Sequence, residues 1–348
     1  MTDFAFAIPG DLGLPTGGYA YDRRVMAECR RAGINAMHLA LPDGFPFPSP
    51  QVISRSESML SALPAGQPVL IDGLALGTLP AAMLRGLQRP LAALVHHPLA
   101  LETGLNPDQQ AHFFASERAA LAEVAAVIVT SPMTARILAR DYAVPSEKLV
   151  VAVPGTDPKT RARGGSTPPR ILAVGTVIPR KAYGVLVDAL NTLRSRDWIC
   201  HIVGATDRDA GETQALRYAI AAQQLEGRII LQGSMTAEAL EGEYEAANIF
   251  VSASLYEGYG MALTEALAHG LPIVAARGGA IEETLPVDAA VLVAPGDAGA
   301  LAQSIGALLD QPQSRRAMAE TAWEKAQTLP RWPETAAIIA ATMGAIAA

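Results

Sequence analysis

The sequence contains no run of roughly 18 or more consecutive apolar residues, although half of its 348 residues are hydrophobic. A helix that spans a membrane is therefore not expected. The first residues, MTDFAFAIPGD, include the acidic Asp3 and no basic residue, which argues against a secretory signal peptide and favours an initial strand. Together these absences predict a cytoplasmic protein.

Cysteine and positive charge are also scarce. Cys29 and Cys200 lie far apart and without metal-ligand spacing, so we expect no disulfide framework. The 27 basic and 34 acidic side chains give a net charge of −7, which argues against general nucleic-acid binding. The one local basic cluster comprises Arg23, Arg24, Arg30 and Arg31. Two interpretations stay open for it: a solvated helix face, or a contact with anionic lipid or acceptor that would allow weak membrane association.

Short apolar strands alternate with helical patterns, which is typical of a parallel sheet covered by helices. Strands are expected at 4–8, 36–40, 69–72, 91–95, 127–130, 170–175, 198–203, 228–231 and 249–251, and helices at 19–31 and 117–125. Proline-rich residues 42–50 should form a loop, and residues 159–169 a linker. Because the strand pattern starts again after this linker, the sequence predicts two α/β domains.

Two glycine-containing turns lead into helical patterns. The turn at 10–18 does not spell G-x-G-x-x-G, so a Rossmann dinucleotide site loses its main support. The second turn follows the strand at 249–251, contains Gly258 and Gly260, and leads into a helix that starts near Met261. Free N–H groups at a helix N-terminus favour an anion, and glycine allows a ligand to approach the backbone. This turn is therefore predicted to bind phosphate.

Two carboxylates, Glu257 and Glu265, flank this turn with seven residues between them. In this setting they resemble the E-x7-E signature of retaining GT-B glycosyltransferases, most closely glycosyltransferase family 4. Supporting motifs occur in order along most of the chain, namely Pro15-Thr16-Gly17-Gly18, Pro154-Gly155-Thr156-Asp157, Val174-Gly175 with Arg180-Lys181, Gln232-Gly233-Ser234, Gly270-Leu271-Pro272, Gly278-Gly279 and Pro295-Gly296-Asp297.

The resemblance implies the GT-B fold, in which two Rossmann-like α/β domains face each other across a cleft. Residues 1–155 would form the acceptor-binding domain, and residues 156–332 the domain that binds the nucleotide-sugar donor. The last helix, at about 333–348, would pack back on the first domain, with Trp332 as an aromatic anchor.

The resemblance also implies roles for individual residues. Arg180 and Lys181, which follow a strand, would hold the donor diphosphate, as their charge alone also suggests. Glu257 would contact the donor sugar, and Glu265 the ribose. The remaining donor-site residues implied by the family are Gly17, Gly18, Gly175, Gly233, Gly258, Tyr259, Gly260, Met261 and Ala262. Tyr259 departs from the pattern, because the family usually has phenylalanine there.

Histidines end another predicted strand, where ligands bind in α/β proteins. The family places a cleft histidine two residues before a proline, which selects His96 over His97 as the catalytic candidate. His97 and Glu102 are candidates for acceptor contacts.

We therefore expect a retaining glycosyltransferase that moves a sugar from a UDP- or GDP-sugar to a hydroxyl acceptor, either a small molecule, a glycan or a lipid. No metal is expected, because no DxD-type aspartate pair or His/Cys cluster stands beside the predicted site. Two alternatives remain, a GT-B nucleotide-sugar 2-epimerase and a non-catalytic nucleotide-sugar-binding protein. The donor base, the acceptor and the oligomeric state are left open.

Overall fold

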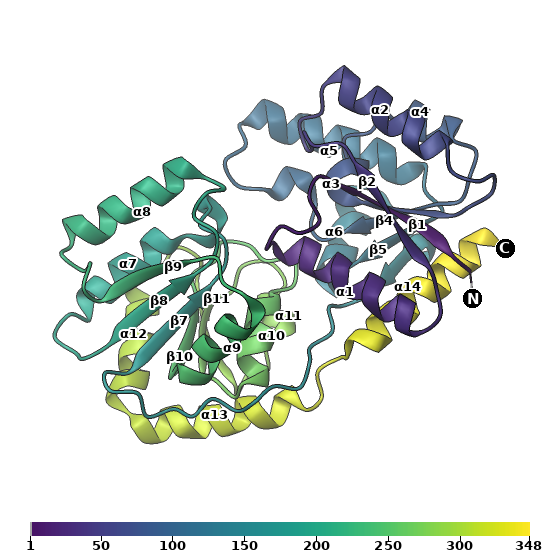
Figure 1. The fold of residues 1–348 in the computed structure, drawn as a ribbon. Coiled ribbons are helices and arrows are strands. Elements are labelled where there is room, and N and C mark those ends of the chain that lie inside the picture. The colour runs from purple at the N-terminus through teal and green to yellow at the C-terminus, as the bar shows by residue number, and fades with distance from the viewer. Residues whose placement is uncertain (1) are drawn as a thin grey trace. The chain divides into compact units, whose positions relative to one another are not determined.

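The computed structural model describes residues 2–348, which divide into two compact units. Unit 1 comprises Met1–Gly155 and Pro330–Ala348, and unit 2 comprises Thr156–Leu329. Both ends of the chain thus belong to unit 1 (Figure 1). None of the helices in residues 2–348 combines the length and the apolar character that crossing a bilayer requires.

Unit 1 is built on a six-stranded parallel sheet in the order β2-β1-β3-β4-β5-β6. The strands are β1 (Phe4–Pro9), β2 (Ala36–Leu41), β3 (Val69–Asp72), β4 (Leu91–Val95), β5 (Ala126–Val129) and β6 (Leu149–Val151). Strands β1, β3, β4 and β5 are buried along their whole length, as expected for a parallel sheet covered on both faces. Their near-continuous apolar sequences reflect this burial.

The helices of unit 1 begin at well-defined caps. They are α1 (Gly17–Arg31), α2 (Pro50–Ser61), α3 (Gly73–Leu76), α4 (Ala81–Gly86), α5 (Pro107–Ala122), α6 (Pro132–Asp141) and α14 (Trp332–Ala347), with short 3₁₀ turns η1 (Leu99–Leu101) and η2 (Ser146–Lys148). Thr16, Ser49 and Ser131 each accept a hydrogen bond from a first-turn amide, which satisfies a donor that the helix leaves unpaired.

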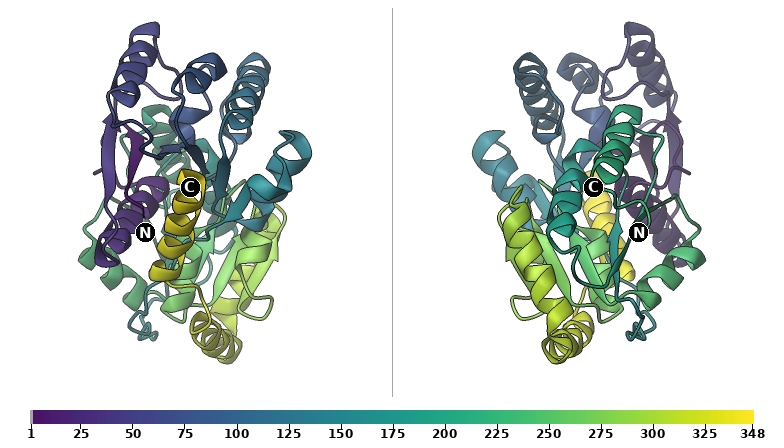
Figure 2. Two further views of the ribbon diagram at one scale, coloured as in Figure 1. Left: turned by 90° about the vertical axis from the view of Figure 1, so that its right-hand side faces the viewer. Right: turned by 90° about the vertical axis from the view of Figure 1, so that its left-hand side faces the viewer.

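The last helix, α14, lies against α1 within unit 1 (Figures 1 and 2). The Trp332 ring meets the Tyr21 ring edge-on at 5.7 Å, and Thr335 Oγ1 donates to Val153 O at 2.8 Å. Gly155 is required here, because a Cβ atom on it would lie 2.2 Å from the backbone nitrogen of Trp332. A side chain at position 155 would therefore push α14 away from the sheet.

Unit 2 repeats the architecture with a parallel sheet in the order β12-β11-β10-β7-β8-β9. Its strands are β7 (Arg170–Val174), β8 (Ile199–Val203), β9 (Ile229–Gly233), β10 (Ile249–Ser252), β11 (Ile273–Ala276) and β12 (Ala290–Val293). Its helices are η3 (Pro179–Lys181), α7 (Tyr183–Thr192), α8 (Ala210–Ala222), α9 (Ala237–Ala246), α10 (Met261–Ala268), α11 (Ile281–Thr284), α12 (Ala298–Asp310) and α13 (Pro312–Ala326).

The predicted parallel α/β organisation is confirmed, and one helix boundary is wrong. The helix expected at 117–125 begins ten residues earlier, at Pro107, and ends at Ala122. Its N-terminus is fixed by a reciprocal capping box, in which Asn106 accepts from Gln109 N and the Gln109 side chain accepts from Asn106 N. This capping box, followed by proline at the first helical position, is a signal that the sequence contained.

Candidate active site

The predicted donor-site residues of unit 2 lie at the carboxyl ends of its central strands. Gly175 directly follows β7, η3 carries Arg180 and Lys181, and Glu257 follows β10, the neighbour of β7. Because the carboxyl ends of parallel strands meet at one edge of the sheet, the fold brings these residues together. The Leu255 N–H donates to Arg180 O at 2.8 Å, which ties the two segments to each other.

Glu257 is bound by both cations. Lys181 Nζ lies 2.5 Å from its Oε1, and Arg180 Nη1 lies 3.3 Å from its Oε2 and donates to Tyr256 O at 2.7 Å. The three side chains are each only 11–15% exposed. Burial alone would raise the Glu257 pKa, but the charges of Lys181 and Arg180 outweigh it and hold that pKa at about 2. Glu257 is therefore a carboxylate at neutral pH, and the cluster carries one net positive charge.

Three glycines make room for this cluster. A Cβ atom on Gly175, at φ +154°, would lie 2.7 Å from Lys181 Cε, so a side chain there would displace the lysine. Gly278 and Gly279 pack against the segment that carries Glu257, and a Cβ atom on either would lie 2.2 Å from a backbone oxygen of that segment. This explains why a Gly-Gly pair follows β11.

The N-terminus of α10 is uncapped. Gly260 occupies the cap position at φ +96°, a backbone conformation that favours glycine, and no side chain accepts a hydrogen bond from the first turn. Gly258 and Tyr259 precede it in the turn, and Met261 and Ala262 form the start of the helix. Such a terminus presents backbone N–H groups and the positive end of the helix dipole to an anion.

Glu265, predicted to bind ribose, lies on α10 and is half-buried. Tyr244 Oη donates to its Oε2 at 3.0 Å and lies 3.2 Å from Ala262 O. Burial raises the Glu265 pKa, and the hydrogen bond from Tyr244 partly offsets that rise. Gly233, one of the predicted donor-site residues, ends β9 at φ +70°, and its carbonyl accepts from Gly204 N at 2.9 Å.

In unit 1, His96 directly follows β4 and lies between two carboxylates. Its Nε2 is 3.4 Å from Asp22 Oδ1 and 3.5 Å from Asp72 Oδ2. Asp22 comes from α1 and Asp72 ends β3. Burial would lower the His96 pKa, but the two carboxylates raise it to about 10. His96 is therefore an imidazolium at neutral pH.

Neither carboxylate was predicted from the sequence, although Asp22 carried a signal. With Val25 and Cys29 it lies on the buried stripe of α1, at positions 22, 25 and 29, where an acidic residue is out of place. The ligand atoms of Asp22, Asp72 and His96 all lie within 4.8 Å of one another, a spacing that could also hold a metal ion.

The other predicted site residues of unit 1 are Gly17, Gly18, His97 and Glu102. Gly17 and Gly18 open α1, and a Cβ atom on Gly18 would lie 3.3 Å from His96 Cδ2, so this glycine lets the helix approach the histidine. His97 Nε2 lies 3.1 Å from Glu102 Oε2, which makes these two residues a pair.

The arginine cluster of α1 is partly structural. Arg23 donates to the carbonyl groups of Leu12 and Leu14, which fixes the loop before α1. Arg24 pairs with Glu28 at 3.0 Å and stacks over Trp332 at 5.6 Å. Arg31 is 69% exposed and pairs with Glu28 at 2.6 Å, and Arg30 is also exposed.

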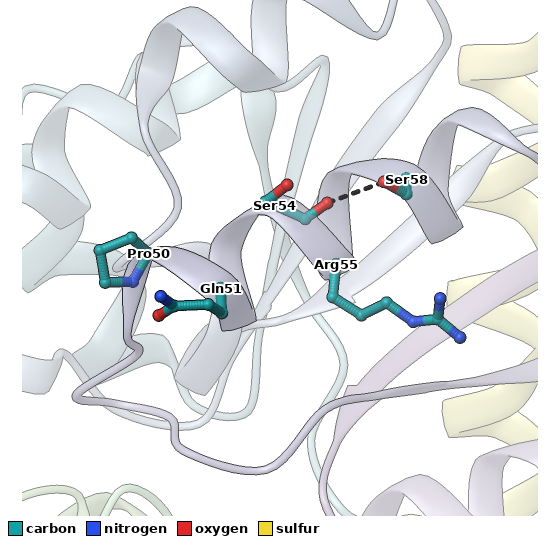
Figure 3. A pocket seen from close by; sticks show the side chains of 5 residues that line it. All are labelled: Pro50, Gln51, Ser54, Arg55 and Ser58. Atoms are coloured by element: carbon teal, nitrogen blue, oxygen red, sulfur yellow. Dashed lines mark hydrogen bonds between the residues drawn. The ribbon is translucent and has the colours of Figure 1, made fainter.

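A hollow of about 480 Å³ lies beside α2 (Figure 3). It is lined by Pro50, Gln51, Ser54, Arg55 and Ser58. The side chains drawn all come from one helix, and none of the predicted site residues is among them.

Comparison with known proteins identifies the family. Residues 20–160 match the family described as Glycosyltransferase Family 4, and residues 168–311 match Glycosyl transferases group 1. A curated MMP alpha-(1->4)-mannosyltransferase from Mycolicibacterium hassiacum is 28% identical over 308 residues, which are 84% of this chain and 74% of that protein. Further curated relatives match over 20–60% of their own lengths.

Solved structures share the fold over nearly the whole chain. A sucrose-phosphate synthase from Thermosynechococcus elongatus has a TM-score of 0.81 at 20% identity, with 97% of this chain and 98% of that one covered. Anabaena HepE in complex with UDP-glucose has a TM-score of 0.77 at 17% identity, with 98% and 99% covered. Two six-stranded parallel sheets and the two family matches lead to one conclusion: the chain belongs to glycosyltransferase family 4, whose members have the GT-B fold and transfer a sugar from a nucleotide sugar.

Proposed function

We propose that this protein is a retaining, metal-independent glycosyltransferase that uses a UDP- or GDP-sugar as donor and a hydroxyl group as acceptor. The observation that carries the proposal is the cluster of Glu257, Lys181 and Arg180 in unit 2, which belongs to the same unit as the uncapped N-terminus of α10. In this proposal unit 2 binds the donor and unit 1 the acceptor.

The charge of the cluster suits a leaving diphosphate. Glu257 neutralises one of its two cations, so one net positive charge remains for the phosphates. Hydrogen-bond donors that are already in place need no reorganisation when the bond breaks. Removing one such hydrogen-bond donor typically slows an enzyme about 10²–10³-fold. Lys181, Arg180 and the α10 amides would supply the stabilisation that a metal ion provides in other transferases.

The proposed bond changes are those of attack on the face that the leaving group occupies. The bond between the anomeric carbon and the diphosphate oxygen breaks as the acceptor oxygen forms a new bond to that carbon on the same face. The acceptor proton passes to the departing phosphate, so no protein nucleophile or general base is needed. Glu257 accepts hydrogen bonds from the donor-sugar hydroxyls, and Glu265 from the ribose hydroxyls.

The relatives support a sugar as the transferred group. The Anabaena HepE structure contains UDP-glucose, which favours a uridine nucleotide as the donor to test first. The Mycolicibacterium hassiacum relative is an α-(1→4)-mannosyltransferase, which favours transfer of a hexose to a hydroxyl group.

The test combines ligand binding with product analysis. A thermal-shift panel of UDP, GDP, ADP and their sugar conjugates should show one nucleotide that raises the melting temperature, because a ligand that binds only the folded state stabilises it. With the matching donor, the anomeric proton coupling in NMR spectra of the product should show the configuration of the donor. An inverted product, a 2-epimerised donor, or a rate abolished by EDTA would contradict the proposal.

A further inference from the structure

The linker, residues 159–169, forms neither a helix nor a strand, yet it is bound to the body of unit 2. The Ala162 N–H donates to His269 O at 2.8 Å, and the Arg163 N–H donates to Glu245 O at 3.0 Å. Ordering a chain segment costs conformational entropy, so these contacts need a physical reason. They hold the linker against α9 and against the C-terminal end of α10, the helix that carries the predicted ribose contact.

His269 is the C-cap of α10, and its side chain is fully buried. Its Nδ1–H donates to Thr160 O at 2.7 Å, because a carbonyl oxygen can only accept. The His269 N–H donates to Glu265 O at 3.0 Å, one helical turn earlier, so the two side chains lie on the same face of α10. One imidazole thus contacts the linker and lies one turn from Glu265.

Tyr244, on α9, connects His269 to Glu265. Its ring stacks on the His269 ring, with 4.9 Å between the centroids and 6° between the planes. Its Oη donates to Glu265 Oε2 at 3.0 Å. The Tyr244 side chain is buried and also stacks on Phe250 of β10, so close packing limits its movement. The position of the Glu265 carboxylate is therefore tied to that of the His269 ring.

A second connection between the linker and Glu265 runs through charges. Lys159 Nζ pairs with Glu241 Oε1, and the other oxygen of Glu241 lies 3.1 Å from His269 Nε2. The Lys159 side chain is only 19% exposed, so solvent screens its charge less than that of a surface lysine. Burial raises the Glu265 pKa, and the Tyr244 hydrogen bond and the charge of Lys159 both act against that rise. Lys159 therefore acts on Glu265 as well as on the linker.

We propose that Lys159, Glu241 and His269 are positioning residues that join the linker to Glu265, so that a nucleoside bound through Glu265 and an ordered linker stabilise each other. The inference rests on the proposed function, which makes Glu265 the contact for the ribose hydroxyls. Ribose hydroxyls that donate to the Glu265 carboxylate hold it against Tyr244, and the stacked His269 ring then keeps its bond to the linker. Because such a coupling is reciprocal, a loosened linker weakens nucleoside binding by the same factor.

The first test is amide hydrogen exchange of the full-length protein with and without UDP. Saturating UDP should slow exchange of the Ala162 and Arg163 amides about 3–10-fold, because their hydrogen bonds open less often. 2′,3′-Dideoxy-UDP lacks the ribose hydroxyls and should bind without this protection. Equal protection by the two nucleotides, or protection by neither, would overturn the proposal. The guanosine counterparts are used if the thermal-shift panel selects GDP.

Two variants test the same coupling from the linker. Lys159→Ala and His269→Phe should each weaken UDP binding about 3–10-fold in isothermal titration, the equivalent of one hydrogen bond. Phenylalanine keeps a ring that stacks on Tyr244 but cannot donate to Thr160. Binding of 2′,3′-dideoxy-UDP should change much less, because the variants act through the ribose contact. An equal loss for both nucleotides would show a merely structural role and would overturn the proposal.

Arg161→Ala is the matched control. Arg161 belongs to the same linker and also forms an ion pair, but with Glu320 of α13. This variant should leave UDP binding unchanged, and thermal unfolding shows whether all three variants fold. A loss of affinity in Arg161→Ala as large as in Lys159→Ala would overturn the proposal, because any linker contact would then suffice.

The titrations also separate this inference from the proposed function. Native protein that binds UDP while Lys159→Ala and His269→Phe bind it equally well would refute the inference alone. Native protein that binds no nucleotide would refute the proposed function, and the inference with it.

Discussion

The two units carry ion clusters of opposite composition at the same topological place, the carboxyl ends of parallel strands. Unit 2 holds one carboxylate, Glu257, between Arg180 and Lys181, whereas unit 1 holds one imidazole, His96, between Asp22 and Asp72. The first cluster has a net charge of +1. In the second, burial raises the Asp22 pKa to about 7, so Asp22 is only partly ionised at neutral pH.

This difference indicates different tasks. A positive cluster attracts an anion, and its carboxylate stays ionised because its pKa is held at about 2. The cluster of unit 1 contains two acidic groups and one histidine, so it is less suited to attract a diphosphate, and its carboxylates raise the His96 pKa to about 10. The first cluster is therefore suited to binding an anion, and the second to binding a proton.

The largest expected effect comes from the positive cluster. Lys181→Ala should reduce kcat about 10²–10³-fold, because in the proposed function it removes a hydrogen-bond donor that stabilises the leaving diphosphate. Glu257 keeps Arg180 as a partner, so folding should change far less than turnover. Initial rates at saturating donor and thermal unfolding measure both quantities, with exposed Lys325→Ala on α13 as the control. An unchanged rate would refute the phosphate assignment.

The cluster of Asp22, Asp72 and His96 can be tested with a double-mutant cycle. His96→Ala should slow transfer about 10–100-fold, the value of one charge-assisted hydrogen bond. If Asp22 acts only through His96, adding Asp22→Asn to this variant should slow transfer no further. Because His96→Ala leaves buried carboxylates without a cation, the double variant should also be the more stable of the two at pH 7. Additive losses of rate would show that Asp22 has a separate role.

The pH dependence of stability should distinguish the clusters further. The folded pKa of Glu257, about 2, lies below its usual 4.5, so its ionisation stabilises the fold above pH 4.5 and this contribution is lost as pH falls toward 2. The shift corresponds to ~3 kcal/mol at neutral pH. Denaturant unfolding between pH 5 and 3 should therefore show a shallower acid loss in Glu257→Gln than in the native protein. Equal slopes would mean that Glu257 is not paired in solution.

The smallest effect is expected beside Glu265, the proposed ribose contact. Tyr244→Phe removes the hydroxyl that donates to Glu265 and should cost ~1 kcal/mol of stability. Donor KM should rise less than tenfold, because the aromatic ring still packs in place and only the orientation of Glu265 is loosened. Urea unfolding and donor titration would measure these changes. A loss of more than tenfold in kcat would place Tyr244 in the chemistry itself.

Much of unit 2 could be predicted because its signals are local. A strand, a glycine turn and a helix lie within a few residues, and the predicted cations follow a strand directly. The pairing of Glu257 with Lys181 was not predictable in the same way. The two are 76 residues apart, and only the adjacency of β7 and β10 brings them together.

Unit 1 shows the same limit more strongly. The register of α1 marks Asp22 as a buried acid, but the helix pattern alone does not say what it faces. Its partner His96 follows β4, and Asp72 ends β3. Neither strand is next to α1 in the chain. Whether a histidine is neutral or charged depends on these distant neighbours, so its protonation state could be argued only from the structure.

Isothermal titration with UDP and uridine tests most directly whether the positive cluster binds the diphosphate. GDP and guanosine replace these ligands if the thermal-shift panel selects GDP. The native protein should bind the diphosphate much more tightly than its nucleoside, and Lys181→Ala should reduce that ratio by at least about tenfold, as loss of one charge-assisted contact implies. Equal ratios in the two proteins would contradict the assignment of Arg180 and Lys181 to the donor phosphates.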